Sequence, residues 1–126
     1  MYLDVVVLFA LVKKEDYNKP YAERITAMKG EKMTSTAALL ELELVTNREL
    51  GPEVAMKLDE WLVEKFPKLK IVDFNHRHFQ KSLELRKKYG LGILDSLHAA
   101  ICLDKKQPIA STDIAFDRVP GLARIK

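Results

Sequence analysis

This sequence of 126 residues has few of the features that cross-link a chain or anchor it in a membrane. It contains a single cysteine, Cys102, so no disulfide can form within the chain, which is typical of proteins of a reducing compartment. The longest uninterrupted apolar run, Val5 to Val12, has eight residues, too few to cross a bilayer. No basic segment precedes this run, and Asp4 stands directly before it, which is unlike a secretion signal. We therefore expect a cytoplasmic protein without a membrane segment.

Motifs of several large enzyme classes are also missing. There is no Gly-x-Ser-x-Gly pattern, no P-loop and no Gly-x-Gly-x-x-Gly pattern. Histidine is scarce, with three residues in all. His76 and His78 are two positions apart, so on a helix their rings would diverge by about 200° and could not readily bind one ion. His98 lies in an apolar segment and is interpreted as a core histidine, although it is close enough in sequence to contact Asp95.

Composition and length indicate one folded domain spanning residues 1–126. With 48% hydrophobic and 31% charged residues, the chain has the balance of a globular protein and enough apolar side chains for a core without disulfides. No internal repeat, low-complexity segment or linker divides it. The net charge of +3 is too small to identify a partner.

Short apolar runs alternate with amphipathic segments along the chain. Strands are predicted over Met1–Asp4, Lys32–Ser35, Leu69–Phe74, Pro108–Ser111 and Leu122–Ile125. Helices are predicted over Val6–Lys13, Pro20–Met28, Thr36–Glu49, Pro52–Phe66, Asn75–Tyr89 and Leu94–Lys105. This alternation predicts an α/β fold, a three-layer α/β/α arrangement with a mainly parallel central sheet. The functional site of such a fold lies beyond the carboxyl ends of the strands.

Four carboxylates stand in apolar surroundings at widely spaced positions. Asp4 and Asp113 follow strand-like runs, Glu41 lies within an apolar helix, and Asp95 begins another. An uncompensated carboxylate in such surroundings costs several kcal/mol. A divalent cation with oxygen ligands would compensate all four, so the sequence predicts that folding gathers them around Mg²⁺ or Mn²⁺.

A helical projection separates Glu41 from Glu43. At about 100° per residue, Glu41 falls near the middle of an apolar arc and is expected to face inward. Glu43 instead falls among the polar residues Thr36, Thr46 and Asn47. The arc consists of Leu40, Leu44, Ala37, Val45, Ala38 and Leu42. The alternative is a glutamate that reaches past its leucine neighbours to water.

Two of the acids have a second interpretation. Asp95 and Asp113 each begin a predicted helical turn, where aspartate commonly caps amide groups without a catalytic role. Asp117, four residues after Asp113, either adds a further metal ligand or pairs with Arg118 or Arg124.

Hydroxyl and basic side chains extend the predicted site. Thr112 is a candidate to hydrogen-bond a carboxylate or a metal-bound water, and Ser35 and Ser96 are weaker candidates for the same role. Basic clusters outside the acidic segments suit a polyanionic substrate, although each alone is also typical of a solvated helix end. The candidates for RNA binding are Lys13, Lys14, Arg86, Lys87 and Lys88.

Four stretches, in this order, resemble the motifs of the PIN domain family of metal-dependent ribonucleases, especially its VapC-type toxin branch. The first is Tyr-Leu-Asp-Val-Val-Val-Leu-Phe-Ala-Leu, with Asp4, and the second is Ser35–Leu42, with Glu41. The third is Leu-Asp-Ser-Leu-His-Ala-Ala, with Asp95. The fourth is Ser-Thr-Asp-Ile-Ala-Phe-Asp-Arg-Val-Pro-Gly-Leu, with Asp113.

The resemblance implies a PIN-like fold and a metal-dependent endoribonuclease, with Asp4, Glu41, Asp95 and Asp113 as its catalytic acids. It implies one or two Mg²⁺ or Mn²⁺ ions held by Asp4, Asp95 and Asp113, with Asp117 as a further candidate. It further implies an RNA substrate, a homodimer, and an antitoxin protein that inserts an arginine or lysine among the acids.

The chain departs from the family pattern directly after the first aspartate, where Val5 and Val6 stand in place of the usual threonine and asparagine. This departure motivates a second hypothesis, a catalytically degenerate PIN-like module that acts through RNA or protein binding. A third hypothesis is a small phosphatase or phospho-receiver that uses Asp4. This hypothesis ranks lower. A phosphatase of this kind would need a second aspartate at the position of Val6, and a phospho-receiver would need two adjacent acids early in the chain.

Overall fold

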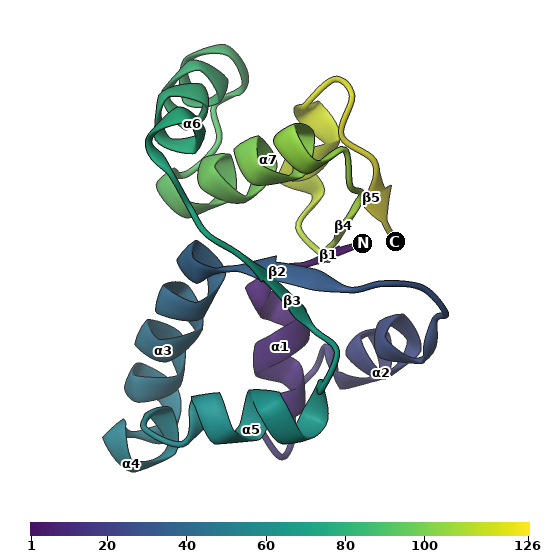
Figure 1. The fold of residues 1–126 in the computed structure, drawn as a ribbon, viewed down its shortest axis with the longest axis vertical. Helices are drawn as coiled ribbons and strands as arrows, with labels where there is room; N and C mark the ends of the chain where they lie inside the picture. Colours follow the sequence, from purple (N-terminus) through teal and green to yellow (C-terminus); the bar gives the residue numbers. More distant parts are fainter.

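The computed structural model describes all 126 residues and has a five-stranded parallel sheet at its centre (Figure 1). Every neighbouring pair of strands is parallel, and the order across the sheet is β3-β2-β1-β4-β5. The strands are β1 (Tyr2–Leu3), β2 (Met33–Ser35), β3 (Lys70–Val72), β4 (Ile109–Ala110) and β5 (Arg124–Ile125). The predicted parallel sheet is therefore confirmed, and β1 lies at its centre.

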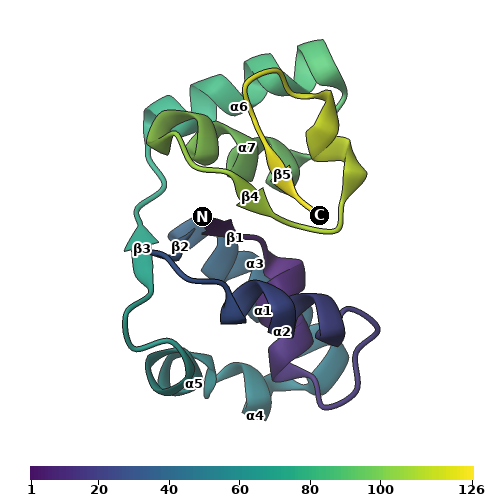
Figure 2. The same cartoon turned by 90° about the vertical axis from the view of Figure 1, so that its right-hand side faces the viewer.

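Helices cover both faces of the sheet, which confirms the predicted three layers (Figures 1 and 2). One layer consists of α1 (Val5–Val12), α2 (Lys19–Ala27), α3 (Thr36–Leu50), α4 (Pro52–Ala55) and α5 (Leu58–Lys65). The other contains α6 (His76–Tyr89) and α7 (Ile93–Lys105), and a short 3₁₀ helix, η1 (Ile114–Arg118), follows β4. None of these helices is long and apolar enough to serve as a transmembrane span.

The single helix predicted over Pro52–Phe66 is wrong, because the structure divides it into α4 and α5. The break lies at Met56 and Lys57, where the Lys57 amide donates to the Val54 carbonyl three residues earlier. This bond tightens the turn and interrupts the α-helical pattern. Neither glycine nor proline marks the break, so the sequence carries no local signal for it.

The apolar arc predicted for α3 is only partly correct. Leu40 and Leu44 are more than half exposed, whereas Thr46, expected on the polar side, is fully buried. The buried face of the helix comprises Ala37, Ala38, Leu42 and Thr46. Glu41 still faces inward as predicted, with its side chain 19% exposed and in contact with the buried His98.

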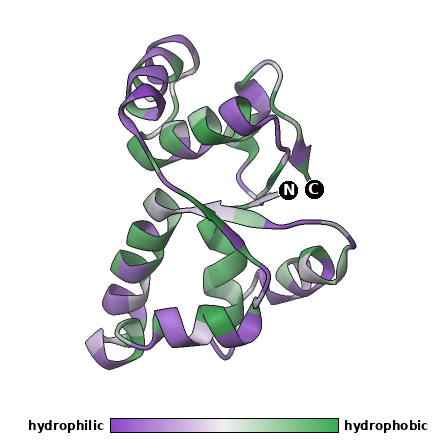
Figure 3. Cartoon of the chain, viewed as in Figure 1, coloured by the Kyte–Doolittle hydropathy of each residue, from purple (hydrophilic) through white to green (hydrophobic).

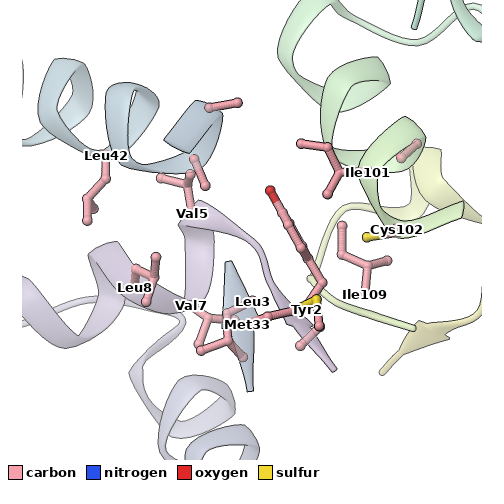
Figure 4. Packing of buried hydrophobic residues seen from close by; sticks show 14 of the residues in the cluster. Tyr2, Leu3, Val5, Val7, Leu8, Met33, Leu42, Ile101, Cys102 and Ile109 are labelled. Carbon is pink, nitrogen blue, oxygen red and sulfur yellow. The ribbon is translucent and has the colours of Figure 1, made fainter. Parts of the chain in front are cut away.

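The core lies on both faces of the central strands, and α1 is hydrophobic along its length (Figure 3). Successive residues of β1 point to opposite faces, as expected for a strand. Figure 4 shows the Tyr2 ring extending toward Ile101 of α7, whereas Leu3 lies with Val7 on the α1 side. Because all strands run the same way, the residues after β1, β2 and β4 meet at one edge of the sheet.

Candidate active site

A pocket of about 330 Å³ opens at the carboxyl ends of the central strands. It contains all four acids that the sequence analysis singled out, although they come from positions up to 109 residues apart, from Asp4 to Asp113. The other acids are Glu41 of α3 and Asp95 of α7. The remaining lining residues are Val5, Val6, Phe9, Val45, Ser111 and Thr112.

Asp4 is the most buried of these acids. Its side chain is 9% exposed, and both of its oxygens accept hydrogen bonds. Oδ1 accepts the Val5 amide at 2.8 Å, and Oδ2 accepts the Ser111 hydroxyl at 2.6 Å. Burial raises the pKa of Asp4, and the charge of Glu41 adds to this, although His98 and the two hydrogen bonds oppose it. The site therefore holds a carboxylate whose negative charge is only partly compensated.

Ser111 is a site residue that the sequence analysis missed. Its hydroxyl donates to Asp4 and accepts the Asp113 amide N–H at 3.1 Å, so it links two of the acids. The register of β1 and β4 explains this position, because Leu3 pairs with Ala110 and the next residues on both strands become neighbours. Thr112, whose hydroxyl was predicted to hydrogen-bond a carboxylate, lines the pocket, but its side chain makes no hydrogen bond.

Asp95 and Asp113 lie close enough to repel each other. The pKa of Asp95 is raised to about 7, first by burial and then by Asp113 and Asp4. The capping alternative holds for Asp113, whose Oδ1 accepts the Ala115 amide at 2.9 Å. At Asp95 only part of it holds: no side chain caps the start of α7, but Asp95 lies in the first turn of this helix, where a negative charge complements the dipole.

His98 is the second site residue that the sequence analysis did not assign a role. It is fully buried, as expected for a core histidine, but it contacts Glu41 and not Asp95. Its Nε2 lies 2.8 Å from Glu41 Oε1 and 4.0 Å from Asp4 Oδ1. Burial alone would lower the pKa of His98, but the hydrogen bond to Glu41 and the charge of Asp4 outweigh it and raise the pKa.

The two serines have different roles. Ser35 caps α3, because its Oγ accepts the Ala38 amide at 3.1 Å, and it also lies 2.7 Å from the Tyr2 hydroxyl. It therefore supports the helix that carries Glu41. Ser96 donates to the Ile93 carbonyl of its own helix at 2.7 Å and does not contact a carboxylate, since its hydroxyl is used within α7.

Asp117 lies outside the pocket. Of the two roles that the sequence left open for it, metal ligand or partner of an arginine, the structure shows the second. Both of its oxygens accept hydrogen bonds from the Arg124 guanidinium at 2.9 Å. This pairing lowers the pKa of Asp117, chiefly through the hydrogen bond from Arg124. The carboxylate is thus occupied by arginine and is not available as the fifth acid of the cluster.

None of the five predicted RNA-binding residues lines the pocket. Lys13 is the C-cap of α1 and Lys14 follows it, so both lie beyond the far end of a helix about 12 Å long that begins beside Asp4. The other three, Arg86, Lys87 and Lys88, form the last turn of α6. The prediction that His76 and His78 do not share an ion is consistent with the structure, in which His78 Nε2 lies 2.8 Å from Asp104.

The donor atoms of the pocket suit a hard divalent cation. Four carboxylates supply oxygen ligands, and the pKa values of Asp4 and Asp95 are raised by burial first and by neighbouring carboxylates second. One carboxylate oxygen each of Asp4 and Glu41 and a ring nitrogen of His98 lie within 4.8 Å of one another. Oxygen-rich donor sets favour Mg²⁺ and Mn²⁺ over softer metals. The residues present therefore fit such an ion.

Comparison with known proteins agrees with the fold. A sequence model of the PIN domain matches residues 1–122, and none of the curated proteins matches the chain. VapC20 of Mycobacterium tuberculosis, a toxin that cleaves the sarcin–ricin loop, is 18% identical with a TM-score of 0.78, over 90% of this chain and 89% of that one.

Two toxin–antitoxin complexes are similar to the chain in structure. VapBC2 of Rickettsia felis, bound to a DNA fragment from its promoter, is 18% identical with a TM-score of 0.75, over 98% of this chain and 96% of that one. VapBC-1 of nontypeable Haemophilus influenzae is 21% identical with a TM-score of 0.70, over 99% of this chain and 96% of that one. At these identities the likeness establishes the fold, whereas the PIN match covers nearly the whole sequence. The chain belongs to the PIN domain family.

Proposed function

We propose that this protein is an endoribonuclease that depends on Mg²⁺ or Mn²⁺. The observation that carries the proposal is the convergence of Asp4, Glu41, Asp95 and Asp113 on one pocket at the end of a parallel sheet. Such a cluster has a high electrostatic cost in the absence of a cation, as the pKa of Asp95 near 7 indicates. Structural requirements alone do not account for a group that is so poorly compensated.

Each side chain of the pocket has a definable task in this proposal. Asp4, held by Ser111 and the Val5 amide, presents a fixed carboxylate from the centre of the sheet. Asp95 of α7 and Asp113, which follows β4, would supply further carboxylate oxygens, and a bound cation would displace the proton that the raised pKa of Asp95 favours. When bound, such an ion supplies a water of lowered pKa and stabilises charge on the phosphate oxygens. The protein contributes orientation and an oxygen-lined cavity.

We infer that the substrate is RNA and that the partner is an antitoxin protein. Membership of the PIN family supports the ribonuclease activity, and the likeness to VapBC complexes supports the antitoxin. An acidic pocket suits an antitoxin that inserts an arginine or lysine between the carboxylates. We also propose a homodimer, as the family resemblance implies.

A second candidate function is a PIN-like module that binds RNA or protein but does not cleave. The observation that favours it is that Val5 and Val6 line the acidic pocket, so this wall offers no polar side chain to a ligand or its water. Saturable Mn²⁺ binding below millimolar concentrations would support the nuclease, and its absence would support the module.

The proposed function is tested by cleavage of a structured RNA in the presence of Mn²⁺ or Mg²⁺. We expect cleavage that EDTA abolishes, and loss of cleavage in Glu41→Gln and in Asp95→Asn. Glu43→Gln is the matched control, because Glu43 is an exposed carboxylate two residues from Glu41 on the same helix. Full activity of either pocket variant in a folded protein would refute the assignment.

A further inference from the structure

A chain of buried hydrogen bonds leads from Glu41 into the core. His98 Nε2 lies 2.8 Å from Glu41 Oε1, and His98 Nδ1 lies 2.7 Å from the Tyr2 hydroxyl. That hydroxyl lies 2.7 Å from Ser35 Oγ, which accepts the Ala38 amide. Tyr2, Ser35 and His98 have no exposed surface, so none of them can touch a substrate.

Both ring nitrogens of His98 are engaged within the protein. A carboxylate oxygen only accepts hydrogen bonds, so the 2.8 Å contact with Glu41 requires a hydrogen on Nε2. Nδ1 faces the Tyr2 hydroxyl and points away from the pocket. Both ring nitrogens are thus occupied by hydrogen bonds, which is the arrangement of a residue that orients its neighbours.

The same chain connects the elements that carry the acids. Tyr2 belongs to β1 and lies two residues before Asp4. His98 and Asp95 are both on α7, three residues apart. Ser35 caps α3, the helix that carries Glu41. Val5 and Val6 form the pocket wall beside Asp4 and offer no side-chain hydrogen bond to Glu41. The hydrogen bond that the Glu41 carboxylate makes within the protein is therefore the one with His98.

We propose that His98 is a positioning residue that donates its Nε2 hydrogen to Glu41 and holds this carboxylate toward the pocket, with Tyr2 and Ser35 fixing the ring. The inference rests on the proposed nuclease function. It also rests on the two hydrogen-bond contacts of the ring, 2.8 Å to Glu41 and 2.7 Å to Tyr2.

Two substitutions at His98 separate its two nitrogens. The side-chain amide of His98→Gln can replace Nε2 as a donor to Glu41, whereas that of His98→Asn reaches only as far as Nδ1. We expect His98→Asn to lose 10- to 100-fold in Mn²⁺ affinity or kcat, as is typical when a residue that orients a ligand is lost. His98→Gln should recover most of this loss, and the KM for RNA should change little in both.

Tyr2→Phe and His78→Gln complete the set. Tyr2→Phe keeps the buried ring but removes the hydroxyl that fixes Nδ1, so Mn²⁺ affinity or kcat should fall by up to about 10-fold. His78 is the matched control, a buried histidine whose Nε2 also lies 2.8 Å from a carboxylate, that of Asp104, away from the pocket. His78→Gln should cost stability and leave both quantities unchanged.

A measurement on the unsubstituted protein keeps the test independent of folding and of RNA cleavage. ¹⁵N NMR of the imidazole rings should show His98 with hydrogen on Nε2, before and after addition of Mg²⁺ or Zn²⁺. Loss of that hydrogen on metal addition, or equal Mn²⁺ affinity in the Gln and Asn variants, would overturn the positioning role. If the protein cleaves no RNA, the proposed function fails, while the NMR spectrum and Mn²⁺ affinities still decide the role of His98.

Discussion

Replacement of Asp95 by asparagine should stabilise the metal-free protein while it abolishes activity. The reason is the pKa of Asp95, which is raised from 3.8 to about 7 by burial and by the nearby Asp113 and Asp4. A carboxyl group with a raised pKa in the folded state binds a proton more tightly there than in the unfolded chain. Its contribution to stability is therefore greatest below the unfolded pKa and is lost as the pH rises from about 4 to about 7.

The magnitude follows from the difference between these two pKa values. At 1.36 kcal/mol per pH unit, the difference would correspond to about 4 kcal/mol above pH 7. Asp95 is only partly buried, so solvent screening reduces this to an expected gain of about 1–2 kcal/mol. For a domain of this size, such a gain raises Tm by roughly 5 °C.

The assay is thermal unfolding of Asp95→Asn and the unsubstituted protein in EDTA, at pH 8 and at pH 4. The variant should melt higher at pH 8, and the difference should vanish at pH 4, where both side chains are neutral. Asp104→Asn on the same helix is the control of opposite sign, because the hydrogen bond with His78 lowers the pKa of Asp104. If the Asp95→Asn variant had the same Tm as the unsubstituted protein at pH 8, or a lower one, the proposed repulsion among the acids would be refuted.

Three further predictions follow from the site and the core. Mn²⁺ affinity, measured by calorimetry, should rise about tenfold per pH unit below pH 7 and level off above it, because the metal must displace the proton on Asp95; a flat profile from pH 5 to 8 would contradict this. Ser111→Ala removes a hydrogen-bond donor to Asp4 and should lower kcat for RNA by 10- to 100-fold with folding retained; unchanged cleavage kinetics would argue against this role. Leu42→Ala, at a fully buried position of α3, should cost about 2–5 kcal/mol in urea unfolding, and a smaller loss would mean that the core collapses around the cavity.

The departure at Val5 and Val6 acquires a structural interpretation from this geometry. Both valines line the acidic pocket with apolar side chains, so the side chains that hydrogen-bond the acids come from other elements. Ser111 supports Asp4 from the neighbouring strand, and His98 supports Glu41 from α7. An enzyme could therefore remain active without polar side chains at positions 5 and 6.

The sequence by itself determined the order of helices and strands, the parallel three-layer fold and the gathering of Asp4, Glu41, Asp95 and Asp113. These features depend on local periodicity, on capping residues and on a rule of connectivity, because parallel strands bring their carboxyl ends to one edge. The energetic cost of an acid in apolar surroundings can likewise be inferred from the sequence alone.

Only the tertiary structure decided which neighbours those acids have. Ser111 meets Asp4 through the register of β1 and β4, and His98 meets Glu41 because α7 packs beside α3. Asp117 is paired with Arg124 for the same kind of reason, a contact between η1 and β5. Contacts of this type join residues that are distant in sequence or on different elements, so no local pattern specifies them. The pairing of side chains across elements is set by packing, which only the folded chain reveals.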